Sequence, residues 1–181
     1  MRTQADKIYL ELLQEVLTNG DQVTTRNSDV YSHFNLPNVT FTEFPLITLR
    51  KTAAMKAIRE MEFFLSGNPK CPEELLDWWS GQLNPQGMLW NAYPEQFRHS
   101  SFEGSDGGIA YFDQVAFIKD ALKTNPNSRR LLISLWNGGE MAAITETNEN
   151  PNCPTVCHSI VIQFFVREGS LHMKTYQRSV H

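Results

Sequence analysis

The sequence predicts an α+β fold, with a large mixed or antiparallel sheet flanked by helices. Two observations support this prediction. Apolar residues recur at helical spacing in three segments, and segments rich in Val, Ile, Phe, Tyr and Thr come in runs between and after those helices. Grouped runs of helices and strands are typical of α+β domains. With 181 residues, 41% of them hydrophobic, the chain can fill one core, so we expect a single domain over residues 1–181.

The chain begins with a helix followed by strands. In residues 6–20 the apolar side chains follow helical spacing, and the segment ends in a glycine that suits a C-terminal cap. Residues 23–36 and 44–51 combine β-prone side chains with Asn and Pro. This pattern predicts two or three strands, the first of them paired as a hairpin.

A second helix and an aromatic-rich segment follow. The spacing of apolar residues predicts a helix over 52–68, with Thr52 as its N-cap and Gly67 at its end. Residues 71–98 are rich in Trp, Gly and Pro, with a short helical piece at 72–79 that begins with proline. Aromatic residues in such a segment usually line a surface or a site.

The sequence pattern of the C-terminal half predicts one helix and three strands. Residues 112–126 form an amphipathic pattern that ends at an Asn-Pro pair, and residues 128–136 read as a strand. Two further strands are expected over 158–167 and 170–179. The residues between them suit a tight hairpin turn.

Charge and hydropathy exclude several classes of protein. The net charge is only −4 and there is no basic block, so we expect no nucleic-acid partner. Apolar runs fall short of the roughly 20 residues that cross a bilayer, and the first residues lack the apolar core of a signal peptide. We expect no membrane partner and a cytoplasmic location. The odd number of cysteines, three, then argues for reduced thiols.

The segment NCPTVCHSIVIQFFV, residues 152–166, places two cysteines and a histidine before an apolar strand. Cys157 is either a small buried residue or a nucleophile. A nucleophilic thiolate needs a cationic neighbour to lower its pKa, and Arg178 on the adjacent predicted strand could supply that charge. Cys153 and Cys157 with His158 or His172 fit no familiar zinc spacing, so we predict no metal. Cys71 is expected to be structural.

Glu60 lies within an otherwise apolar face of the helix predicted over 52–68. A carboxylate near a buried face is costly unless it has a partner. Its position fits either a boundary residue in contact with solvent or a functional acid. The Arg-Arg pair at 129–130 fits either surface salt bridges or recognition of a phosphate, which the planar fork of arginine suits best.

Five stretches, in order, resemble the thymidylate synthase family. They are residues 44–67 (FPLITLRKTAAMKAIREMEFFLSG), 93–98 (YPEQFR), 125–137 (NPNSRRLLISLWN), 157–166 (CHSIVIQFFV) and 176–179 (YQRS). The resemblance extends from about Arg26 to Ser179, and five ordered elements are more specific than any single motif. It implies an enzyme of that family and its fold.

The resemblance implies a role for each candidate residue. Cys157, followed by His158, adds to carbon 6 of a uracil ring, and the enolate so formed attacks a one-carbon electrophile from carbon 5. Glu60 holds the water network that moves protons, and Tyr93 transfers a proton. The residues that would bind the substrate phosphate are Arg26, Arg129, Arg130, Arg178 and Ser179. Those that would line the substrate and folate sites are Gln177, Trp78, Trp79, Trp136 and Asn137.

The resemblance also implies partners and alternative reactions. The substrate is a pyrimidine deoxynucleotide monophosphate, the co-substrate is 5,10-methylene-tetrahydrofolate, and the paired arginines reach the site of the other subunit in a homodimer. Transfer to dUMP with hydride transfer gives dTMP. Addition of water to the methylene intermediate would instead make the chain a dUMP or dCMP hydroxymethylase. A third alternative is an inactive nucleotide-binding fragment.

Four departures from the family pattern concern the site. Asn27-Ser28 stands where Thr-Gly is usual, and Pro94 stands where Gly is usual. One extra residue separates Cys157 from Gln163, which requires a bulge if the cysteine is to keep its register. The family continues beyond the position of His181 with base-reading, folate-binding and C-terminal segments. The expected domain therefore lacks the C-terminal part of the family fold.

Overall fold

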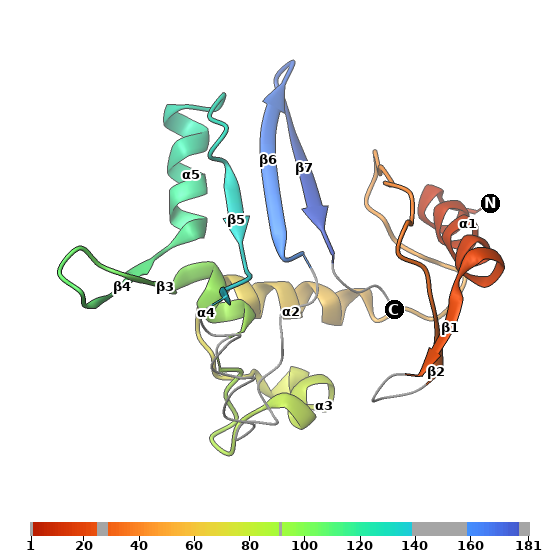
Figure 1. Cartoon of the computed structure of the whole chain (residues 1–181), viewed down its shortest axis with the longest axis horizontal. Helices are drawn as coiled ribbons and strands as arrows, with labels where there is room; N and C mark the ends of the chain where they lie inside the picture. Colours follow the sequence, from red (N-terminus) through yellow and green to blue (C-terminus); the bar gives the residue numbers. More distant parts are fainter. Residues whose placement is uncertain (1, 25–28, 91, 139–158, 178–181) are drawn as a thin grey trace. The chain divides into compact units, whose positions relative to one another are not determined.

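A computed structural model describes residues 2–24, 29–90, 92–138 and 159–177 (Figure 1). The chain divides into two compact units, Met1–Ala54 and Met55–His181. The described elements are helices and antiparallel strands, which confirms the α+β class. Within these ranges, no helix is both long and apolar enough to cross a membrane.

The N-terminal unit contains the predicted first helix and hairpin. Helix α1 (Gln4–Asn19) begins at a capping box, in which the side chains of Thr3 and Asp6 each accept a hydrogen bond from the other residue's backbone N–H. Strands β1 (Asp21–Thr24) and β2 (Asp29–Ser32) pair antiparallel. In the described part of this region, two strands are present where the sequence predicts two or three.

Residues 44–51 form no strand, and side-chain hydrogen bonds take the place of a ladder there. Oδ1 of Asp6 accepts a 2.6 Å hydrogen bond from the backbone N–H of Thr48, and Oδ2 accepts one of 2.6 Å from its hydroxyl. The Asp6 side chain is fully buried. A buried, multiply bonded carboxylate thus fixes this segment to the start of α1.

Helix α2 (Ala54–Ser66) begins later than the sequence predicts. Thr52 is not its cap, because the Thr52 hydroxyl donates a 3.3 Å hydrogen bond to the carbonyl of Ile47. The end of the helix agrees with the prediction. Gly67 follows it with φ +74°, a left-handed conformation that glycine adopts without steric cost.

The aromatic-rich segment contains short helical elements. The 3₁₀ turn η1 (Glu73–Leu75) leads into α3 (Leu76–Trp79), and a second turn, η2 (Ser80–Gln82), follows. This confirms the predicted helical piece at 72–79. Helix α4 (Tyr93–Arg98) closes the segment.

A hairpin that was not predicted precedes the next helix. Strands β3 (Ser100–Glu103) and β4 (Ile109–Phe112) pair antiparallel. Helix α5 (Gln114–Thr124) follows, and Asp113 caps it by accepting a 2.8 Å hydrogen bond from the backbone N–H of Ala116.

The last three strands form one sheet in the order β5-β6-β7, and all neighbours are antiparallel. They are β5 (Leu132–Ser134), β6 (Val161–Arg167) and β7 (Ser170–Tyr176). The predicted hairpin between β6 and β7 is confirmed, with Glu168 and Gly169 both at positive φ. The described strands fall into three small sheets rather than one large one.

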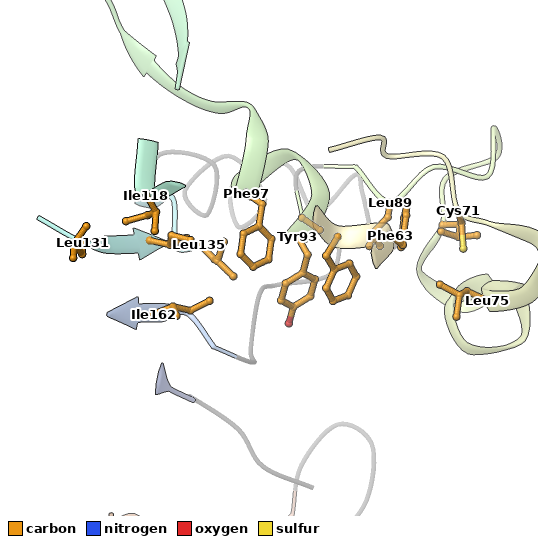
Figure 2. Close-up of a cluster of buried hydrophobic side chains, with 14 of the residues drawn as sticks. Phe63, Cys71, Leu75, Leu89, Tyr93, Phe97, Ile118, Leu131, Leu135 and Ile162 are labelled. Atoms are coloured by element: carbon orange, nitrogen blue, oxygen red, sulfur yellow. The ribbon is translucent and has the colours of Figure 1, made fainter. Parts of the chain in front are cut away.

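The core of the second unit joins these elements. Figure 2 shows a continuous band of buried side chains that runs from Leu131 and Ile162 through Phe97 and Tyr93 to Leu75. Burial of this apolar surface is the main favourable contribution to folding of this unit.

Gln114 ties three elements of this unit together. Its side-chain amide donates to the carbonyls of Gln96 in α4 (2.8 Å) and Ser134 in β5 (2.7 Å), and its Oε1 accepts from the Ser134 N–H (2.9 Å). Asp113 pairs with Arg98 at 2.8 Å. These contacts give Asp113 and Gln114 structural roles in this unit.

Candidate active site

Glu60 is a half-buried acid with a specific partner. Nε1 of Trp79 in α3 donates a 2.7 Å hydrogen bond to Oε1 of Glu60 in α2. Burial raises the pKa of the Glu60 carboxyl above its usual value, and the indole hydrogen bond opposes that rise. An acid with a raised pKa releases and accepts protons closer to neutral pH, which suits general acid–base chemistry.

Aromatic rings surround this pair. Phe64 lies one helical turn after Glu60 on the same face of α2 and stacks on the ring of Tyr93, with centroids 4.4 Å apart. The indole of Trp79 meets both rings edge-on, at 5.8 Å from Phe64 and 6.2 Å from Tyr93. The structure therefore brings three predicted site residues, Glu60, Trp79 and Tyr93, into one group. With Phe64, we call it the Glu60 cluster.

The first turn of α4 places Tyr93 in this cluster. Tyr93 is 4% exposed, and the following Pro94 is buried beside it. Proline is well tolerated in the first turn of a helix, where backbone N–H groups have no partner within the helix. The departure from the family pattern at Pro94 is thus compatible with the local backbone.

Trp78 has a different environment from its neighbour Trp79. Its ring lies under the ammonium of Lys56, 5.2 Å from the ring centroid, and the same ammonium pairs with Asp77. Trp78 remains 41% exposed. Lys56 was not predicted as a site residue, because Asp77 is distant along the chain and their contact depends on how α3 packs against α2.

Trp136 and Asn137 line a separate cavity of about 510 Å³. It lies between the β3–β4 hairpin, the start of α5 and the end of β5, and Nδ2 of Asn137 donates a 3.3 Å hydrogen bond to Oγ of Ser101. The described lining consists of hydroxyl, amide and aromatic groups without a charged side chain. Such a surface suits a neutral or aromatic group better than a phosphate.

Arg129 and Arg130 lie in the turn before β5, and both are exposed. The Arg130 backbone N–H donates to Oγ of Ser128 at 3.1 Å. Among the ion pairs between described residues, none includes either guanidinium. The two guanidinium groups therefore face solvent. They belong to the turn before β5, whereas the Glu60 cluster is formed by α2, α3 and α4.

Of the remaining predicted site residues, the structure describes Gln177. Gln177 is exposed and directly follows β7. The other five lie outside the described residues: Arg26, Cys157, His158, Arg178 and Ser179.

The backbone before β6 is irregular. Ser159 has φ +49°, and the next residue, Ile160, accepts a 2.9 Å hydrogen bond from the N–H of Leu135. From Val161 onward the pairing with β5 and β7 is regular. The left-handed Ser159 therefore precedes the ladder, and the predicted bulge concerns Cys157, which lies outside the described residues.

Cys71 is the cysteine that the structure describes. It is 5% exposed, and burial, followed by the charge of Glu74, raises the pKa of its thiol. A buried thiol of this kind is a poor nucleophile, which agrees with the predicted structural role. In the part of the chain that the structure covers, no group of three His, Cys, Asp or Glu side chains could hold a metal ion.

The matched family is identified by its sequence model. A sequence model of a family described as thymidylate synthase matches residues 7–181. The matched range includes the Glu60 cluster, the paired arginines and the segment that contains Cys157.

Proposed function

Because the chain belongs to the thymidylate synthase family, we propose that it transfers a one-carbon unit from 5,10-methylene-tetrahydrofolate to carbon 5 of dUMP, giving dTMP. Family membership supports a methyltransferase-type enzyme of nucleotide biosynthesis, with dUMP and the folate as substrates. The match over residues 7–181 is the observation on which this proposal rests.

In the proposed reaction the Cys157 thiolate forms a bond to carbon 6 of dUMP. The electrons of the 5,6 double bond move into the ring as an enolate, and carbon 5 then attacks the methylene group of the folate. Loss of the carbon 5 proton releases tetrahydrofolate, which returns a hydride to the exocyclic methylene and leaves as dihydrofolate. Release of the cysteine restores the double bond.

The pairing of β6 with β7 supports a role for Arg178 beside Cys157. Val161 pairs with Tyr176 at one end of the ladder. In the sequence, Cys157 comes shortly before Val161, and Arg178 comes shortly after Tyr176. A guanidinium near the thiol would lower its pKa and raise the thiolate fraction. His158 is proposed as a second polar neighbour of the nucleophile.

The Glu60 cluster supports the proton-transfer part of the proposal. Its half-buried carboxyl has a raised pKa and a fixed indole partner, and Tyr93 lies in the same group. We assign removal of the carbon 5 proton to the water network held by Glu60 and Tyr93.

The binding roles follow the same proposal. Trp78, Trp79, Trp136, Asn137 and Gln177 line the pyrimidine and folate sites. Arg26, Arg178 and Ser179 hold the phosphate together with Arg129 and Arg130 of the second subunit in a homodimer. The exposure of Arg129 and Arg130 is compatible with contact to a partner. The three-stranded sheet is then part of the large sheet of one domain, and the enzyme acts in the cytoplasm without a metal.

The proposal is tested with dUMP tritiated at carbon 5. The purified chain should release tritium only when methylene-tetrahydrofolate is present, and the product should be dTMP. A Cys157→Ala variant should release none, whereas Cys71→Ala, which removes a buried thiol, should retain release. A hydroxymethyl product would instead identify the chain as a hydroxymethylase. The same assay with dCMP would then show which of the two nucleotides it prefers. A folded wild-type chain that releases no tritium would favour the inactive nucleotide-binding alternative.

A further inference from the structure

Helix α2 contacts α3 through two side chains on one face. Lys56 and Glu60 are one helical turn apart, so they project in the same direction. Lys56 pairs with Asp77, and Glu60 accepts a hydrogen bond from Trp79. The two contacts fix the orientation of α3 at its start and at its end.

Lys56 has a second contact that Glu60 lacks. Its ammonium lies over the ring of Trp78, 5.2 Å from the centroid, within the range of a cation–π interaction. The Lys56 side chain is only 27% exposed, while Trp78 is 41% exposed. Trp78 therefore has an ordered cation against its ring and considerable ring surface left open.

We propose that Lys56 is a positioning residue, which holds the Trp78 ring in place as one wall of the folate co-substrate site. The inference rests on the proposed function, and it concerns a residue that acts only through Trp78. An aromatic ring already held in one orientation loses less conformational freedom when a heteroaromatic ring stacks on it. The ammonium itself does not contact the reacting atoms.

The kinetic test compares Lys56→Met with two matched variants. Arg59→Met removes a positive charge from the same helix, but Arg59 pairs with Glu62, not with an aromatic ring. Lys56→Arg keeps a cation that can pair with Asp77 and stack on Trp78. We expect Lys56→Met to raise KM for methylene-tetrahydrofolate roughly twofold to fivefold, the equivalent of one exposed cation–π contact, with kcat unchanged. Arg59→Met should leave KM unchanged, and Lys56→Arg should restore it.

A spectroscopic test does not depend on turnover. The chain has four tryptophans, so 5-fluorotryptophan labelling gives four fluorine resonances, and Trp78→Phe identifies that of Trp78. Lys56→Met should shift this resonance, and Arg59→Met should not. Methylene-tetrahydrofolate should also shift the Trp78 resonance in the wild type. In Lys56→Met, half of this shift should require a higher concentration of the co-substrate.

The outcomes separate this inference from the proposed function. If the wild type makes no product but the co-substrate moves the Trp78 resonance as described, the positioning role stands and the proposed reaction fails. If the wild type is active but Lys56→Met behaves like Arg59→Met, the positioning role is wrong and the reaction stands. A Trp78 resonance that the co-substrate does not move also overturns the inference.

Discussion

Nε1 of Trp79 donates a 2.7 Å hydrogen bond to Oε1 of Glu60, and this bond joins two helices that are separated along the chain by the whole 67–75 segment. Two opposing influences act on the carboxyl. Burial raises its pKa, and the indole donor lowers it. The protonation of Glu60 therefore depends on whether α3 keeps Trp79 in place.

Trp79→Phe should raise the pKa of Glu60 further. The ring still shields the carboxyl from water, but the donor that stabilises the charged form is gone. The measurement is kcat/KM for dUMP as a function of pH. The limb of this profile that depends on Glu60 should move to higher pH. Trp78→Phe is the matched control, because Trp78 contacts Lys56 instead. A limb that stays in place in Trp79→Phe would contradict this account of Glu60.

Gly67→Ala should destabilise the second unit. Gly67 has φ +74°, and an added Cβ would lie 2.6 Å from Cβ of Arg98. The left-handed backbone and this overlap should together lower the free energy of unfolding by about 2 kcal/mol or more. Urea denaturation measures the loss. Gly81→Ala is the control, because an added Cβ there meets no atom within 4 Å. Equal stability of the two variants would contradict the prediction.

Asp6→Asn should weaken the first unit in a pH-dependent way. Hydrogen bonds led by the Thr48 hydroxyl lower the pKa of Asp6 from 3.8 to about 2. A depressed pKa means that the carboxylate stabilises the fold above pH 3.8, and that this contribution is lost as the pH falls toward 2. Amide-exchange protection of α1 should therefore be lower in Asp6→Asn than in the wild type at pH 5. The difference in protection between the two proteins should shrink as the pH falls. A difference that stays constant with pH would contradict the prediction.

Ser159→Gly should stabilise the chain. Ser159 has φ +49°, where a side chain is strained and glycine is not. We expect a gain of about 1 kcal/mol in the free energy of unfolding, measured by urea denaturation. Ser159→Val should have the opposite effect, since a β-branched side chain fits this conformation worst. A destabilising glycine would show that the serine side chain makes a needed contact.

Local patterns accounted for most of the fold. The helices over α1, α2 and α5 and the β6–β7 hairpin follow from periodicity and turn residues, which depend only on neighbouring residues. The β3–β4 hairpin was missed although glycines at 104, 107 and 108 separate two β-prone runs. Its strands are largely exposed, so they lack the apolar alternation that marks a half-buried strand.

The candidate site was predicted less completely. An acid on an apolar helical face identified Glu60, but the sequence could not show that Trp79 is its partner. The Lys56–Asp77 pair could not be predicted for the same reason, since a contact between residues distant in sequence depends on tertiary packing. Glu60 and Tyr93 could be assigned roles only through family resemblance, because the residue types alone also fit ordinary core positions.

The most direct test of the central claim is formation of a covalent adduct at Cys157. The purified chain is incubated with 5-fluoro-dUMP and methylene-tetrahydrofolate and examined by intact mass, with Cys157→Ala and Cys71→Ala in parallel. The fluorine cannot leave as the carbon 5 proton does, so the ternary adduct should accumulate in the wild type and in Cys71→Ala, and be absent in Cys157→Ala. A folded chain that forms no adduct, or forms it without Cys157, would contradict the proposed mechanism.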